Sequence, residues 1–442
     1  FIFFDSKKNK LIAARDEFGQ KPLYYHRNTD GLTISSNIQS IKNLANLKEI
    51  NYQSLKMYLS TQSSLILPKQ TMYKEIFSLE AGQYLEFEKN KIKIIKYFKP
   101  LKYFNNKQFN KNKKKNTKLI REEIVKILKD NVNHHSITDT KIGLLISGGV
   151  DSSLIYEIYK KQIIKHSIKK KMNLMTALHN KKMSYVATTV PKITKTKFDK
   201  KNSFVFKKKD YFKSLIKLIE FSGFPQRWGG GVPMSHCTKR FKDLNIKTIM
   251  SGDGLDEFLG GYQNELNLKF SKVAKYYFPK FLSYNDDSIF YDRSIKQKFV
   301  KHITKLRNQS YLKFKNLKNQ NYNEYLFKCF QHEFTCFFLQ SVTLIQSDEY
   351  SMINSTEMRS PFVNKELFKI LINLPIKFFY KKNKDKLIFR SILKNYGNYN
   401  FNQKKEGTRN YSKYFSNKKF WNFKKFYLSN FFDFSRLNNW RE

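Results

Sequence analysis

The sequence predicts an α/β protein in which a smaller unit rich in β-strands precedes a doubly wound parallel sheet with a helical annex. Three patterns support this prediction. Apolar strand candidates alternate with helical periods between residues 118 and 250. Two polar, glycine-rich loops each follow an apolar strand directly. Short apolar runs separated by turns fill the first hundred residues.

The first hundred residues predict successive antiparallel strands at residues 1–4, 11–14, 22–26 and 32–35. A short helix is expected from Asn37 to Leu44. Because the chain begins with Phe1 and its opening residues have the pattern of a strand within a domain, we expect that the true N-terminus is missing.

Residues 104–117 are polar and highly charged and lack spaced apolar positions, so a linker is expected there. An amphipathic helix is predicted from Lys118 onward. The strand candidates that follow are 142–146, 172–179, 203–206 and 246–250, and the helices between them begin near 152, 210 and 234. From residue 264 onward the pattern is mostly helical. Strand–helix alternation of this kind is typical of a parallel sheet, whose ligands bind at the carboxyl ends of strands.

The length of 442 residues is enough for two or three domains, and 40% hydrophobic residues with 16% aromatic residues permit real cores. No apolar run approaches the ~20 residues that cross a bilayer, and no signal peptide is visible. Cys237, Cys329 and Cys336 fit no metal or disulfide spacing. They indicate buried thiols in a reducing, cytoplasmic protein.

The net charge of +48, from 84 Lys and Arg against 36 Asp and Glu, raises the question of nucleic-acid binding. The lysines, however, are scattered through every segment and accompany Asn, Ile, Phe and Tyr. A bias towards A/T-rich codons produces this mixture without any binding function. The distribution therefore argues against a nucleic-acid partner.

The first glycine-rich loop lies in the stretch LLISGGVDSS, after the apolar run Ile142–Ile146. A glycine turn between a strand and a helix lets backbone N–H groups approach phosphate oxygens, and the helix start adds partial positive charge. Ser147 and Ser152 can donate hydroxyl groups. Asp151 would repel phosphates unless a cation lies between them, so it implies Mg²⁺. A plain strand–turn–helix with small residues would also explain a glycine turn, but the full S-G-G-x-D-S pattern disfavours it.

The second loop, SGDGLDEFLGGY, follows the strand candidate 246–250 and carries Asp253, Asp256 and Glu257 within five positions. An acidic loop that merely caps a helix is the alternative interpretation, and the presence of the first motif favours a functional site instead. Because both loops follow strands of one expected parallel sheet, they can face one another across a single site.

These motifs carry a family resemblance. Residues 147–152 resemble the pyrophosphate-binding loop of the N-type ATP pyrophosphatases, and residues 251–262 resemble the S-G-[ED]-G-x-D-E-x-x-G-G-Y signature of asparagine synthetases. Residues 14–25, ARDEFGQKPLYY, resemble a segment of the class II glutamine amidotransferase domain. The chain is identified as a member of the asparagine synthetase family, with a resemblance that runs from residue 1 to about 415.

The resemblance implies a partial αββα Ntn-hydrolase (type 2 glutamine amidotransferase) domain at 1–103, a linker at 104–117, and an ATP pyrophosphatase domain, similar to the adenine nucleotide alpha hydrolases, at 118–442. Arg15 and Asp16 are expected to be structural, as an ion pair. The segment SDEYSMINSTEMRSPFVNKELF resembles a family segment that lines the active site. Within this segment, Glu357 and Arg359 are expected either to line the active site or to form a buried ion pair.

The resemblance also implies ATP and Mg²⁺ as cofactors, with Asp151 and Asp256 as the magnesium ligands. Asp253 would support formation of an acyl-adenylate, and Lys405, in QKKEGTRNYSKYF, would neutralise charge on the departing pyrophosphate. The residues expected to bind the nucleotide are Leu144, Ser147, Gly148, Gly149, Asp151, Ser152, Ala177, Ser251 and Gly252.

The implied reaction adenylates a carboxylate, aspartate in the first place, releases pyrophosphate, and forms an amide with ammonia that normally comes from glutamine. The family's N-terminal catalytic cysteine is absent from this sequence, so we expect it to use ammonia rather than glutamine. Its partners are then small molecules, and a homodimer is left open. Asp253 stands where Glu is usual, which keeps another acceptor open, such as a sugar acid or surface-glycan precursor. A tRNA-modifying ATP pyrophosphatase and an inactive scaffold also remain open.

Overall fold

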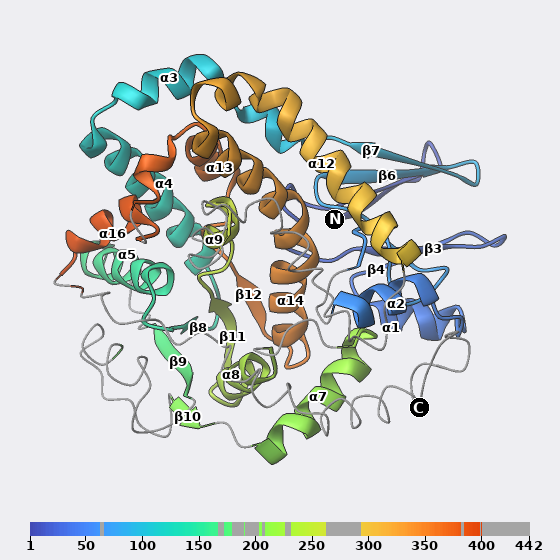
Figure 1. Ribbon diagram of the computed structural model, residues 1–442. Coiled ribbons are helices and arrows are strands. Elements are labelled where there is room, and N and C mark those ends of the chain that lie inside the picture. The colour runs from blue at the N-terminus through green and yellow to red at the C-terminus, as the bar shows by residue number, and fades with distance from the viewer. Residues whose placement is uncertain are drawn as a thin grey trace.

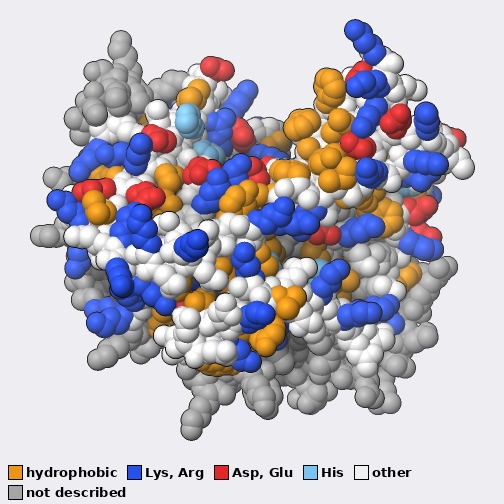
Figure 2. Space-filling view, turned by 90° about the horizontal axis from the view of Figure 1, so that it is seen from above, with side chains coloured by type: hydrophobic (Ala, Val, Ile, Leu, Met, Phe, Trp, Pro, Cys, Tyr) orange, Lys and Arg blue, Asp and Glu red, His pale blue; other side chains and the backbone are white. Residues whose placement is uncertain are grey.

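The computed structural model (Figure 1) describes residues 1–61, 66–166, 172–178, 190, 203–205, 208–225, 231–261, 293–381, 384–397 and 399. None of the helices among these residues has the length and apolar character of a membrane-spanning segment. Figure 2 shows Lys and Arg side chains spread over one face of the molecule, with Asp and Glu among them. The spread on this face agrees with the scatter of lysines along the sequence.

The N-terminal unit forms two antiparallel sheets. One has the order β1-β2-β6-β7 and the other the order β4-β3-β5. The strands are β1 (Ile2–Asp5), β2 (Lys10–Ala14), β3 (Tyr24–Arg27), β4 (Leu32–Ser35), β5 (Phe77–Ser78), β6 (Gln83–Glu88) and β7 (Lys91–Lys96). The four predicted strands are therefore confirmed. They are not one series, however, because β2 pairs with β1 and β6 whereas β3 pairs with β4 and β5.

Two helices accompany these sheets. The predicted short helix is α1 (Ile38–Leu44), and Asn37 caps it by accepting a hydrogen bond from the Ser40 N–H. Helix α2 (Tyr52–Thr61) follows. Buried apolar side chains of this unit, including Ile38 and Ile41, share a cluster with Leu215 of the second unit, so the two units are joined by apolar packing.

The predicted linker is folded. A 3₁₀-helix, η1 (Pro100–Tyr103), leads into α3 (Asn106–Lys114), which begins at an Asn105 cap. Phe109 of α3 is fully buried, and Asn112 donates a hydrogen bond to the Asn373 carbonyl. Two buried aromatic residues, Phe104 and Phe109, thus anchor a stretch whose composition indicated a linker, because sequence composition does not reveal a long-range partner.

The second unit contains a five-stranded sheet of order β10-β9-β8-β11-β12 in which every pairing is parallel. The doubly wound parallel sheet predicted from the sequence is thereby confirmed. Its strands are β8 (Lys141–Leu145), β9 (Asn173–Leu178), β10 (Ser203–Val205), β11 (Ile246–Met250) and β12 (Glu357–Arg359). The chain runs from β8 outward to β9 and β10, and then returns to β11 on the other side of β8. The order of the strands therefore reverses between β8 and β11, where such sheets bind ligands.

Helices cover both faces of the parallel sheet (Figure 1). Ile142 and Leu144 of β8 belong to a core cluster with residues of α4, α5, α15 and α16, whereas Leu145 packs with Phe241 of α8 on the opposite face. The bounds of these helices are α4 (Thr117–Ser136), α5 (Val150–His166), α7 (Lys208–Ser222), α8 (Gly231–Asp243), α9 (Leu255–Phe258), α15 (Lys365–Ile372), η4 (Ile376–Phe378) and α16 (Leu387–Lys394).

The helical annex contains α12 (Arg293–Gln320), α13 (Tyr322–Glu333) and α14 (Leu344–Met352). Between α13 and α14 the backbone forms a π-helix, η3 (Phe334–Thr343), most of whose side chains are buried. The Gln340 side chain in η3 accepts a hydrogen bond of 2.8 Å from the Ala81 N–H of the N-terminal unit. The π-helix η3 therefore connects the helical annex to the N-terminal unit.

Candidate active site

The two glycine-rich loops predicted from the sequence lie side by side. Each follows one of the paired parallel strands β8 and β11. A Cβ atom built on Gly252 would lie 2.9 Å from the Asp151 Cβ and 3.2 Å from the Ser152 N atom. These separations are too short for any side chain larger than hydrogen, so glycine is required at this position. The loops thus form one site at the point where the strand order reverses.

The first loop is organised by its own hydroxyl groups. The Ser147 N–H donates to the Ser152 Oγ at 3.2 Å, and the Gly149 N–H donates to the Ser147 Oγ at 3.3 Å. Gly148 has φ of +71°, the left-handed region that favours glycine. Helix α5 then starts at Val150 with Asp151 in its first turn. A turn of this kind in front of a long helix is suited to bind phosphate.

Asp151 and Asp256 come together around a buried lysine. The Lys386 Nζ lies 2.6 Å from the Asp151 Oδ2 and 2.6 Å from the Asp256 Oδ1. The Lys386 side chain is only 8% exposed. Burial alone lowers the pKa of Lys386, but the negative charges of Asp151, Asp256 and Asp385 outweigh it and raise the pKa above its ordinary value. Since one nitrogen contacts both carboxylates, the two acids are close enough for a single ion to join them.

These two acids fit a magnesium ion. Asp151 Oδ1 is buried and receives no hydrogen bond from any described residue, so one oxygen has unused acceptor capacity beside the phosphate loop. The described residues contain no group of three or more His, Cys, Asp or Glu side chains that could hold a metal alone. Mg²⁺ is typically bound by one or two carboxylates together with substrate phosphates, and this donor set matches that pattern.

Asp253 occupies a separate position in the second loop. Its Oδ2 accepts hydrogen bonds from the Ser251 Oγ at 2.7 Å and from the Ser347 Oγ at 2.6 Å. Ser347 belongs to α14, so the helical annex orients this carboxylate. Ser347 begins the segment that resembles the family's active-site lining, but its bond to Asp253 could not be predicted, because nothing in the local pattern of α14 indicates this partner.

Glu257 is the buried acid of the second loop. Its side chain accepts a 2.7 Å hydrogen bond from the Thr343 Oγ1. Burial, followed by the charge of Asp256, raises the pKa of Glu257 to about 7. Glu257 thus faces the annex, whereas Asp256 faces Lys386.

The remaining predicted residues are placed as follows. Leu144 lies within β8 and its side chain is fully buried, so only its backbone could meet a nucleotide. Ala177 lies in the neighbouring strand β9, and its side chain is outside the part that the structure describes. Lys405 lies outside the described residues. The nucleotide-binding or catalytic roles of these residues stay predictions.

Two expectations about ion pairs are corrected. Glu357 and Arg359 do pair at 2.9 Å in β12, but their side chains are 43% and 24% exposed, so the pair is not buried. Arg15 and Asp16 are structural, as predicted, yet they bind backbone groups rather than each other. The buried Arg15 guanidinium donates to the carbonyls of Lys21 and Leu79, and Asp16 accepts N–H groups of the turn that follows it.

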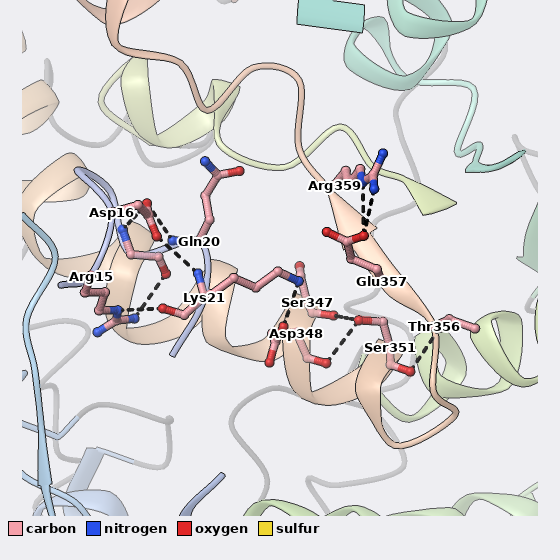
Figure 3. A network of polar contacts seen from close by, with 11 residues as sticks. Arg15, Asp16, Gln20, Lys21, Ser347, Asp348, Ser351, Thr356, Glu357 and Arg359 are labelled. Carbon is pink, nitrogen blue, oxygen red and sulfur yellow. Dashed lines mark hydrogen bonds and ion pairs between the residues drawn. The ribbon is translucent and has the colours of Figure 1, made fainter. Parts of the chain in front are cut away.

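This turn connects the N-terminal unit to the site (Figure 3). Lys21 reaches Asp348 of α14 at 2.9 Å, and Asp348 adjoins the Ser347 that holds Asp253. On the same turn, the Phe18 ring lies 4.9 Å from the Phe258 ring of α9, centroid to centroid. The N-terminal unit therefore makes a polar contact with α14, which holds Asp253, and an apolar contact with α9, the helix that the second loop forms.

Lys386 is a site residue that the sequence patterns did not predict. In a chain with 84 Lys and Arg, one more lysine gives no signal. Lys386 directly precedes the amphipathic helix α16. This position brings it to the two carboxylates only because α16 packs on the core, and the sequence alone does not show that packing.

The parallel sheet and the phosphate-type loop at its switch point define an α/β domain of the ATP pyrophosphatase type, preceded by an amidotransferase-like β-unit. A family model described as "Asparagine synthase" matches residues 123–415, and one described as "Glutamine amidotransferase domain" matches residues 1–98. Since the first match covers more than half of the chain, the protein belongs to the asparagine synthase family.

Curated relatives agree with this assignment at low identity. The chain is 29% identical to "Putative asparagine synthetase [glutamine-hydrolyzing] 2" of Methanocaldococcus jannaschii over 64% of this chain and 52% of that protein. It is 24% identical to "Asparagine synthetase [glutamine-hydrolyzing] 1" of Bacillus subtilis over 88% of this chain and 64% of that protein. "Asparagine synthetase B [glutamine-hydrolyzing]" of Escherichia coli is 24% identical, with 59% and 42% covered. The chain thus spans between about two fifths and two thirds of the length of these relatives.

Proposed function

We propose that this protein adenylates a carboxylate with ATP, releases pyrophosphate, and converts the acyl-adenylate to an amide with ammonia. Aspartate is the proposed substrate, as the names of the relatives suggest. The observation that carries the proposal is the meeting of Asp151 and Asp256 around one cationic nitrogen beside a phosphate-type loop. We further propose the domain division at 1–103, 104–117 and 118–442, although the middle segment is helical rather than a flexible linker.

The chain's own residues would act mainly by positioning. The start of α5, together with the hydroxyl groups of Ser147 and Ser152, would hold the phosphates in place for attack at the α-phosphorus. Asp151 and Asp256 would hold Mg²⁺, which offsets the negative charge of the phosphates when bound. Lys405 would stabilise the charge that grows on the departing pyrophosphate.

Asp253 would act on the substrate side of the reaction. Its Oδ2 is fixed by two serine hydroxyls, so the carboxylate has a defined direction before any substrate enters. Such a fixed carboxylate can orient the amino or hydroxyl groups of an acceptor or take a proton from the attacking ammonia.

A second candidate acceptor is a sugar acid or surface-glycan precursor. The observation that favours it is Asp253 itself, which is one methylene shorter than the usual Glu and is drawn towards α14 by Ser347. A carboxylate held back in this way would leave more room for a larger acceptor.

The test is substrate-dependent pyrophosphate release. The protein is supplied with ATP, Mg²⁺ and ammonium, together with either aspartate or a panel of uronic acids. Release that depends on aspartate, with asparagine as the product, is the expected result. Release with uronic acids alone would identify the second candidate. The absence of pyrophosphate release with every carboxylate would contradict both and favour an inactive scaffold.

The cellular setting proposed from the sequence is the cytoplasm, with small-molecule substrates. All three cysteines are free, and Cys237 and Cys329 are buried, which suits a reducing compartment.

A further inference from the structure

Lys386 occupies the place between the two carboxylates that the proposed function assigns to a metal ion. Its ammonium group makes 2.6 Å contacts to both Asp151 and Asp256. Charge-assisted contacts of this length are the strong class of hydrogen bond. A divalent cation bound between the same oxygens would lie about 2.0–2.1 Å from each, so it and the ammonium group exclude one another.

The backbone holds this lysine in an unfavourable conformation. Lys386 has φ of 52° and ψ of 33°, the left-handed region that side chains other than glycine rarely adopt. It directly precedes α16, whose Ile388, Phe389, Ile392 and Leu393 are buried in the main core. A buried residue outside the favoured region, at a candidate site, points to a role that its surroundings enforce.

The neighbouring groups fix the segment on both sides of Lys386. The Leu387 N–H donates to the Phe379 carbonyl at 3.1 Å, and the Arg390 N–H donates to the Lys386 carbonyl at 2.9 Å. Arg390 also forms an ion pair with Asp385. The backbone of Lys386 is therefore held firmly, and only its side chain needs to move for the two acids to be released.

Lys386 does not satisfy every oxygen of the two carboxylates that it contacts. One ammonium group faces the carboxylates of Asp151 and Asp256, and Asp385 adjoins it on the chain. Asp151 Oδ1 has no donor among the residues that the structure describes. The contact with Lys386 therefore leaves one Asp151 oxygen unsatisfied, and a divalent cation, which takes several oxygen ligands, could use it.

We propose that Lys386 is a placeholder cation that makes metal binding depend on the nucleotide. Without nucleotide, its ammonium group holds Asp151 and Asp256 together and excludes Mg²⁺. Metal alone would have to displace a buried ammonium group, which is costly unless the charge finds a new partner. The adjoining carboxylate, Asp385, does not offer one readily, because it already pairs with Arg390. When Mg²⁺ arrives with ATP, the triphosphate supplies the anions that receive the displaced ammonium group. The inference rests on the proposed function for the identity of the metal site.

The test is metal binding, not turnover. Binding of Mn²⁺, as a spectroscopic substitute for Mg²⁺, is measured by electron paramagnetic resonance with and without α,β-methylene-ATP. The variants are Lys386→Met, which nearly keeps the length of the side chain without its charge, and Lys384→Met, which alters an exposed lysine two residues earlier. Wild type and Lys384→Met should bind Mn²⁺ tightly only with the nucleotide analogue. Lys386→Met should bind Mn²⁺ alone, at least about tenfold more tightly than wild type does.

Further outcomes separate this inference from the proposed function. Asp151→Asn added to Lys386→Met should abolish the nucleotide-independent binding, and its persistence would overturn the inference. Equal Mn²⁺ affinity of the wild type with and without the analogue would also overturn it, and that measurement needs no folded variant. Metal binding by Lys386→Met in a protein that releases no pyrophosphate would support the placeholder while contradicting the proposed activity.

Discussion

The contact between Gly252 and Asp151 provides a substitution whose effect can be worked out from the structure. In Gly252→Ala the new Cβ would lie 2.9 Å from the Asp151 Cβ and 3.2 Å from the Ser152 N atom. Both are rigid parts of the phosphate loop, so the two loops must separate. Ordinary van der Waals contact begins near 3.4 Å, which requires a shift of about half an ångström.

Two magnitudes follow from this shift. Overpacking of a close contact typically costs about 1–3 kcal/mol of stability. Catalytic groups must be held within about 0.5 Å, so we expect pyrophosphate release to fall by about tenfold or more. Gly252 does not have the positive φ that strains other residues, so the predicted loss arises from space alone.

The assay combines thermal unfolding with the rate of pyrophosphate release as Mg²⁺ is varied. Gly397→Ala is the matched control, since the nearest heavy atom to its new Cβ would be 3.4 Å away. We expect the control to resemble wild type in both measurements. A Gly252→Ala protein with the stability and rate of wild type would refute the close approach of the two loops.

Three further predictions concern other residues of the proposed function. Ser347→Ala removes one hydroxyl donor from Asp253, and we expect slower pyrophosphate release with nearly unchanged ATP binding, measured by calorimetry; weaker ATP binding alone would contradict this placement. Lys405→Ala should reduce pyrophosphate release by about 10²–10³-fold and Lys404→Ala should change it little, so equal effects in the same assay would mean that bulk charge matters instead. The pKa of Glu257 is raised from 4.5 to about 7. Between these pH values the folded state binds more protons than the unfolded state. The free energy of unfolding should therefore fall as pH rises through that window, by at most about 1.4 kcal/mol per pH unit. Glu257→Gln should flatten this decline in urea unfolding, and an unchanged slope would exclude this carboxyl as its source.

The parallel sheet and both loops could be predicted because their signals are local. An apolar run followed by Gly-rich polar residues identifies each of β8 and β11, and helical periods separate them. Strand β12 could not be predicted from the sequence. It has three residues, two of them charged, and becomes a strand by pairing with β11. Such pairing depends on a partner more than a hundred residues away.

The candidate site shows the same division between local and long-range signals. Asp151, Asp253 and Asp256 belong to loops with recognisable patterns. Lys386 carries no motif, and the segment that begins at Ser347 does not indicate its bond to Asp253. Both residues reach the site because α16 and the annex pack beside the sheet. The acids of the site could therefore be predicted from the sequence, whereas the groups that hold them could not.

The shared cation site of Asp151 and Asp256 underlies the proposed chemistry, and the rate of pyrophosphate release in Asp151→Asn and Asp256→Asn tests it. Asp243→Asn is the control, since its exposed side chain pairs with Lys239 on the surface of α8. Each site variant should fold, as judged by thermal unfolding, and lose pyrophosphate release by at least about 10²-fold, whereas the control should keep it. Wild-type release in either site variant would contradict a cation shared by the two carboxylates.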